Sequence, residues 1–188
     1  MGVAELDDLY QQFGAIANQA REVAAGLSEA QFNWRPAEHA WSIEECLAHL
    51  TMVGQHEIKL LERAIQDARA RGLTGKPPFH YGCLEKTILR QTEPPARRRF
   101  SSPRRFQPLH GQPLTAILPT FLHVQSQFQR LVEQSDGLDL AGVKVATPIS
   151  RFLKLSLGVT LAQAAAHERR HLEQARRVRG SPQFPGRS

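Results

Sequence analysis

Apolar residues recur at steps of three and four positions along much of this 188-residue chain, and this spacing predicts long amphipathic helices. The first helix is expected over residues 6–27 and the second over residues 43–71. A third is expected over residues 114–134, where Pro119 should kink the helix or mark its true start. The sequence has no internal repeat and no strand-like alternation, so the fold class is predicted to be all-α.

Two capping boxes mark where helices begin. In the sequence SIEE at residues 42–45, the serine hydroxyl accepts a hydrogen bond from the glutamate amide, and the glutamate carboxylate accepts one from the serine amide. The sequence TLAQ at residues 160–163 has the same spacing and is expected to open a last helix that ends near Arg179. Four helices predict a four-helix-bundle domain over residues 1–180, and residues 181–188 are expected to form a flexible tail.

Helical spacing disappears between residues 72 and 112, in a Pro/Arg-rich segment that separates the second helix from the third. Six prolines interrupt this segment, and only residues 84–89 are compatible with a short helix. A loop this long within a compact domain is usually functional or disordered. We call residues 72–112 the insert. A second irregular stretch, residues 136–159, is expected to contain a short helical piece near residues 150–155.

Positive charge is concentrated in the later part of the chain. The formal net charge is +6, yet residues 1–70 carry eleven acidic and five basic residues, whereas residues 71–188 carry seven acidic and nineteen basic ones. Much of the excess lies in two arginine clusters, which are Arg90, Arg97, Arg98, Arg99, Arg104 and Arg105, and then Arg169, Arg170, Arg176, Arg177 and Arg179. Arginine favours bidentate contacts with carboxylates or phosphates, although runs of charge are more often a solvated surface.

Composition excludes several classes of protein. No apolar stretch approaches the ~18 residues that a membrane-spanning helix needs. The first residues are acidic, unlike the basic start of a secretory signal, and two cysteines, Cys46 and Cys83, are too few for a disulfide scaffold. We therefore expect one cytoplasmic domain with no membrane partner.

Three histidines are candidate metal ligands. His167 and His171 are one helical turn apart, on a face where Ala164 and Ala175 leave room inside a bundle. This spacing alone is a weak motif, because eight histidines in a chain of this length give such a pair by chance fairly often, and an ordinary core or surface pair is the alternative. His49 lies on the apolar side of the second helix, where a buried polar group needs a partner. Three neutral imidazoles suit zinc or another late divalent metal and leave one position open, as in catalytic sites.

The order of several segments resembles the DinB-like metalloenzyme superfamily. These segments are Leu27, Phe32-Asn33-Trp34-Arg35-Pro36, Trp41-Ser42-Ile43, His49-Leu50, and then His167, His171-Leu172 and Gln174. The resemblance implies a four-helix bundle with one nickel or zinc ion, held by the residues that correspond to His49, His167 and His171. It also implies frequent homodimers. Some members are transferases or isomerases that use bacillithiol, mycothiol or glutathione as a thiol cofactor, which the metal activates. The insert has no counterpart that we can match in the family's pattern.

Three functions follow from these observations. The first is a thiol-dependent S-transferase that acts on a small molecule, with arginines of the insert holding an anionic thiol or substrate. The second is a metal-dependent hydrolase. The third is a basic binding module, since RRRF at residues 97–100 and RRF at residues 104–106 interleave arginine with phenylalanine, as proteins that bind single-stranded nucleic acids do. No recognised nucleic-acid fold accompanies these motifs, so we do not expect nucleic acid to be the partner.

Neighbouring polar residues have less specific interpretations. His56 is better explained as a core or edge histidine than as a fourth ligand, and His123 has no evident partner on its helix. Cys46, one turn before His49, is better explained as a small buried hydrophobe than as a catalytic thiolate. Glu45 and Glu168 are candidates for orienting the imidazoles, through hydrogen bonds to the ring nitrogens that do not bind the metal.

Two tryptophans flank the start of the second helix. Trp34 and Trp41 are interpreted as core anchors in the connection between the first two helices.

Overall fold

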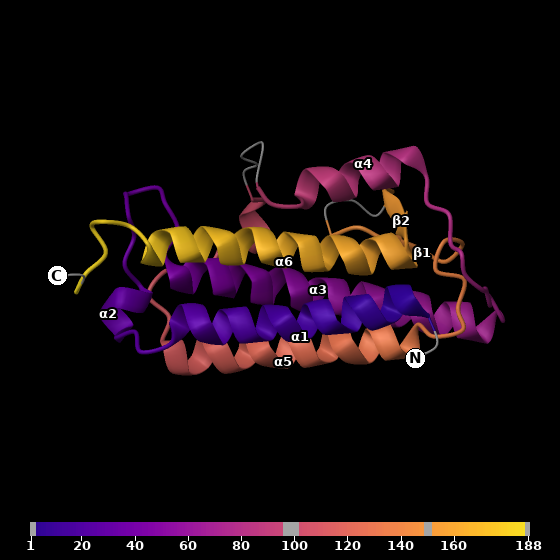
Figure 1. Cartoon of the computed structure of the whole chain (residues 1–188), viewed down its shortest axis with the longest axis horizontal. Coiled ribbons are helices and arrows are strands. Elements are labelled where there is room, and N and C mark those ends of the chain that lie inside the picture. Colours follow the sequence, from indigo (N-terminus) through magenta and orange to yellow (C-terminus); the bar gives the residue numbers. More distant parts are fainter. Residues whose placement is uncertain (1–2, 96–101, 149–151, 187–188) are drawn as a thin grey trace.

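The computed structural model describes residues 3–95, 102–148 and 152–186. Four long helices lie side by side as a bundle (Figure 1), namely α1 (Ala4–Ala24), α3 (Ile43–Ala70), α5 (Leu114–Gln134) and α6 (Leu157–Arg179). Each of α1 and α3 packs against both α5 and α6. The predicted all-α four-helix bundle is therefore confirmed.

The apolar stripes of the four helices form one continuous core. The rings of Phe13 on α1 and Phe128 on α5 stack with their centroids 4.7 Å apart. Gly54 lets α3 and α5 approach closely, because a Cβ at this position would lie 2.7 Å from the Val124 side chain. Helix α5 starts at Leu114 and continues through Pro119, so the expectation that this proline marks the true start is wrong.

Only one of the two predicted capping boxes opens a helix. In the first, the Glu45 amide donates to Ser42 Oγ at 3.1 Å and the Ser42 amide donates to Glu45 Oε2 at 3.0 Å. The second is wrong, because α6 begins four residues earlier, directly after Ser156. Thr160 therefore lies inside the helix, where its hydroxyl donates to the Ser156 carbonyl at 2.9 Å.

The described part of the insert contains two helical segments. Helix α4 (Cys83–Thr92) includes the expected short helix and lies along α6 (Figure 1). Glu85 anchors it, because its carboxylate accepts hydrogen bonds from the amide and the hydroxyl of Ser156 at 2.7 and 2.8 Å. A single 3₁₀ turn, η1 (Arg104–Phe106), follows later in the insert. The motif at residues 97–100 lies outside the described residues.

Two short strands occupy the stretch before α6. Strands β1 (Lys144–Ala146) and β2 (Lys154–Ser156) pair antiparallel, with Val145 opposite Leu155. The expected helical piece near residues 150–155 is wrong at its described end, where β2 lies, and the absence of strands was wrong as well. Three residues give one buried apolar position each, which is too few for a visible alternation.

The C-terminal segment packs against the connection between α1 and α3. Phe184 is buried and its ring packs edge-on against Trp34, with the centroids 5.5 Å apart. The Gln31 side chain, on the single-turn helix α2 (Glu29–Phe32), donates to the carbonyl of Pro185 at 2.9 Å. The described part of the segment expected to be flexible therefore makes specific contacts. None of the helices in the described residues is long and apolar enough to cross a membrane.

Candidate metal centre

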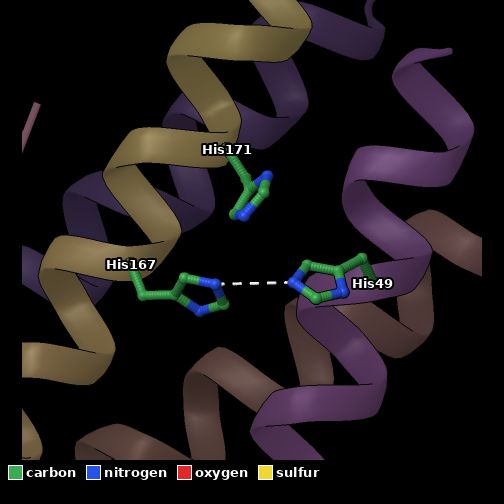
Figure 2. Close-up of side chains that lie close together, drawn as sticks. All are labelled: His49, His167 and His171. Atoms are coloured by element: carbon green, nitrogen blue, oxygen red, sulfur yellow. Dashed lines mark hydrogen bonds between the residues drawn. The ribbon is translucent and has the colours of Figure 1, made fainter. Parts of the chain in front are cut away.

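Three imidazoles from two helices point toward one another inside the bundle (Figure 2). His49 comes from α3, and His167 and His171 come from successive turns of α6. One ring nitrogen of each residue lies within 4.8 Å of the others, and His49 Nε2 is 3.4 Å from His167 Nε2. The three predicted ligands are thus brought together across 118 positions of sequence.

The spacing of these nitrogens suits a small divalent cation. Bonds of about 2.0–2.1 Å to a tetrahedral zinc ion separate its ligand nitrogens by about 3.3–3.4 Å. The contact between His49 and His167 already has this length. One pair of donors is therefore already at the separation that a bound metal requires, and three neutral imidazoles fit the nickel or zinc ion that the resemblance implies.

Hydrogen bonds behind the rings decide which nitrogen is free to bind. His49 Nδ1 lies 2.8 Å from the Phe106 carbonyl oxygen, which can only accept, so Nδ1 carries the proton. His171 Nδ1 donates in the same way to Gln174 Oε1 at 3.1 Å. In both residues the lone pair is left on Nε2, the arrangement usual for histidine ligands.

The surroundings keep the three imidazoles neutral. Burial lowers the pKa of His49, and it lowers the pKa of His171 to about 3 with a further contribution from neighbouring positive charge. Burial, followed by the charges of His171 and His49, lowers the pKa of His167 well below its usual value. A metal ligand must be deprotonated, so the site is ready to bind a cation at neutral pH.

Comparisons with known proteins identify the family of the chain. The sequence profile of the DinB superfamily matches residues 12–175, a range that contains all three histidines and the insert. The chain belongs to the DinB superfamily. It is also 25% identical over 169 residues to the uncharacterized protein YuaE of Bacillus subtilis (strain 168), which covers 88% of this chain and 96% of YuaE. No solved structure matches it. The superfamily is generally metal-binding, as the cluster of histidines suggests for this member.

Trp41 borders the histidine cluster of this DinB protein as well as packing against the core. Its ring centroid lies 4.9 Å from that of His49 and 5.6 Å from that of His171. The sequence predicted only a core anchor, because a tryptophan before a helix cap is commonly used to hold the first turn. The ring of Trp34 packs against Phe184 and not against a histidine of the cluster.

The remaining histidines and the nearby cysteine lie outside the cluster. His56 and His123 are exposed, and neither belongs to the group of potential ligands found among the described residues. Cys46 is fully buried as a free thiol, and burial raises the pKa of that thiol far above its usual value. These surroundings favour the interpretation of Cys46 as a small hydrophobe.

The two glutamates that were candidates for orienting the imidazoles are engaged elsewhere. Glu45 accepts from the Ser42 amide and pairs with Arg35. Glu168 accepts a hydrogen bond at 2.8 Å from Gln125 on α5. The orienting hydrogen bonds come from Phe106 and Gln174 instead. Gln174 is part of the family pattern, whereas Phe106 belongs to the insert and no sequence signal marks its carbonyl as an acceptor.

Proposed function

We propose that this DinB protein is a metal-dependent enzyme in which His49, His167 and His171 hold one divalent cation, with nickel or zinc as the metal. The observation that carries the proposal is the convergence of the three imidazoles, with one nitrogen from each lying within 4.8 Å of the others. Their neutral state and the acceptors behind His49 and His171 support it.

Three protein ligands leave a fourth coordination position on a tetrahedral divalent cation. His49 is buried, whereas His167 and His171 are half-buried. A divalent cation with three protein ligands supplies Lewis acidity, which lowers the pKa of a thiol or a water molecule at its open position. The protein itself contributes the orientation of the ligands and the low-polarity surroundings.

The reaction that we propose is thiol-dependent group transfer to a small molecule. A low-molecular-weight thiol loses its proton, and its sulfur forms a bond to an electrophilic carbon of the substrate. The leaving group departs with its bonding electron pair and is neutralised by a proton, so one thiol and one substrate give one thioether and the protonated leaving group. Arg170, whose positive charge helps to lower the pKa of His167 and His171, favours an anionic thiol or substrate.

Metal analysis of the purified protein tests the site. We expect about one nickel or zinc ion per chain, which is lost in the double variant His167→Ala, His171→Ala. The control is His123→Ala, because His123 is exposed on α5 and away from the cluster. Equal metal content in the double variant and the wild type would contradict the proposal.

A panel of thiols and model electrophiles tests the reaction. The metal-loaded protein should consume thiol and electrophile in equal amounts, and removal of the metal should abolish turnover. Metal-dependent cleavage of an ester or amide without any thiol would favour the hydrolase alternative. Absence of metal-dependent turnover with every thiol would count against group transfer while leaving the proposed metal site unaffected.

We also propose that the protein forms a homodimer, as the family resemblance implies. Measurement of the molar mass in solution tests this proposal.

A further inference from the structure

We propose that Phe106 is a positioning residue for the metal centre, so that the insert sets the metal affinity of the site. Its backbone carbonyl accepts the Nδ1 proton of His49, and its buried side chain holds the carbonyl in place. The inference rests on the proposed metal site. It assigns a role to a segment that the family resemblance left unexplained.

The Phe106 carbonyl is held by contacts that the insert makes with the rest of the molecule. The ring of Phe106 is 7% exposed, and the ring of His56 on α3 packs edge-on against it at 5.7 Å between centroids. The guanidinium of Arg105 lies 5.0 Å from the Phe106 ring centroid and also donates to the carbonyl of Pro148. The η1 turn is closed by a hydrogen bond of 2.8 Å from the Phe106 amide to the Pro103 carbonyl. The Phe106 carbonyl is thus held in place by tertiary contacts of the insert, because η1 is a single turn and not part of a long helix.

The hydrogen bond decides which tautomer His49 adopts. A neutral imidazole has one N–H, and a carbonyl oxygen can only accept, so the proton is held on Nδ1. Nε2, which faces His167 at 3.4 Å, then keeps its lone pair. Without the acceptor, the proton is free to occupy Nε2, and the ring is free to rotate away from the cluster. Loss of such an outer hydrogen bond typically lowers metal affinity by about 10- to 100-fold.

Three variants distinguish a role of Phe106 in positioning His49 from a general effect on the stability of the protein. Phe106→Ala removes the ring that anchors the carbonyl, whereas Phe106→Leu keeps a large apolar side chain at the same place. Leu109→Ala is the control, because Leu109 belongs to the same insert and is 78% exposed. Each variant is checked by circular dichroism and thermal unfolding, and its affinity for zinc and nickel is measured by competition with a chelator of known affinity.

We expect Phe106→Ala to bind either metal about 10- to 100-fold more weakly, and Phe106→Leu to recover most of the affinity. Leu109→Ala should bind like the wild type. The result that overturns the inference is a folded Phe106→Ala protein with wild-type affinity, or a loss in Leu109→Ala as large as that in Phe106→Ala.

The tautomer of His49 gives a second readout that needs no metal. Nitrogen-15 NMR of the metal-free wild type should show His49 protonated on Nδ1 and unprotonated on Nε2, with the signal assigned by its absence in His49→Gln. Protonation on Nε2 would overturn the inference. A wild type that binds no metal would refute the proposed function instead, and the tautomer would still decide the role of Phe106.

Discussion

Glu57 is a buried carboxyl group on α3, two turns beyond His49. Burial raises its pKa from 4.5 to about 8. Between these two values the folded protein holds a proton that the unfolded chain has released, so the free energy of unfolding falls as the pH rises. The histidines of the cluster act in the other direction around and below pH 6.5, where the unfolded chain binds protons that the folded protein does not, because their pKa values are lowered in the folded state. Removal of the Glu57 carboxyl group isolates its own effect, because the contribution of the histidines is the same in both proteins.

We predict that Glu57→Gln makes the slope of the free energy of unfolding against pH less negative between pH 6.5 and 8, by up to about 1.4 kcal/mol per pH unit. Urea unfolding at several pH values in this interval measures it. Glu62→Gln, an exposed site on the same helix, is the control. Because Glu44 and Glu168 have pKa values raised to about 7 and about 8 by burial, some of the slope should remain in the variant. An unchanged slope in Glu57→Gln would contradict the prediction.

The candidate site was predictable at the residue scale only where the chemistry lies in a side chain. His49, His167 and His171 were predicted from imidazoles on apolar helix faces together with the resemblance to the DinB-like superfamily, because their spacing alone is a weak motif. Phe106 was not, because its contribution is a backbone carbonyl, which every residue possesses. Its position depends on how the insert packs, and no local pattern encodes that packing.

Helices α3 and α5 depend on a glycine for their close approach. A Cβ at Gly54 would lie 2.7 Å from Val124 Cγ1 and 3.2 Å from Phe128 Cε2. We predict that Gly54→Ala destabilises the protein by about 1–3 kcal/mol, although alanine is the better helix former, because overpacking outweighs the gain in propensity. Denaturant unfolding of the variant measures the change.

Gly14→Ala is the matched control for this prediction. Gly14 also lies within a long helix, α1, but its nearest neighbour would be the end of the flexible Gln129 side chain at 3.3 Å. This variant should be neutral or more stable by up to about 1 kcal/mol. A stabilised Gly54→Ala protein would show that α3 and α5 can move apart at little cost.

Long elements were predicted well and short ones poorly. The apolar spacing of α1, α3 and α5 extends over several turns, and each turn repeats the same information. At residues 160–163 the local capping pattern did not determine the helix start. Strand β2 and the hydrogen bonds of Ser156 with Glu85 place the start of α6 earlier. Strands β1 and β2 are too short to produce a pattern of their own.

At the scale of the whole molecule, a metal bound to the three histidines would link α3 to α6. A ligand that binds only the folded state stabilises it by about 2.7 kcal/mol at 100 times its dissociation constant. For a chain of this size, this corresponds to a rise in the melting temperature of about 5–10 °C. We predict such a rise when zinc or nickel is added to the wild type, and its loss on chelation.

His49→Ala tests whether the stabilisation comes from this site. Its melting temperature should not respond to added metal, because one of the two linked helices no longer contributes a ligand. The shift in each protein is compared with that protein's own metal-free value, so any intrinsic instability of the variant cancels. An equal rise in both proteins would place the binding elsewhere.

The position of α6 in the chain also has a consequence for how the protein is made. Helix α6 packs against both α1 and α3 and carries two of the three histidines, yet it follows the other three long helices in the chain and leaves the ribosome after them. Until it emerges, the faces of α1 and α3 that it covers stay exposed to water, and His49 lacks the other two histidines of the cluster. Closure of the core and assembly of the triad are therefore late, simultaneous events, and a nascent chain that stalls before residue 157 exposes apolar surface to chaperones and proteases.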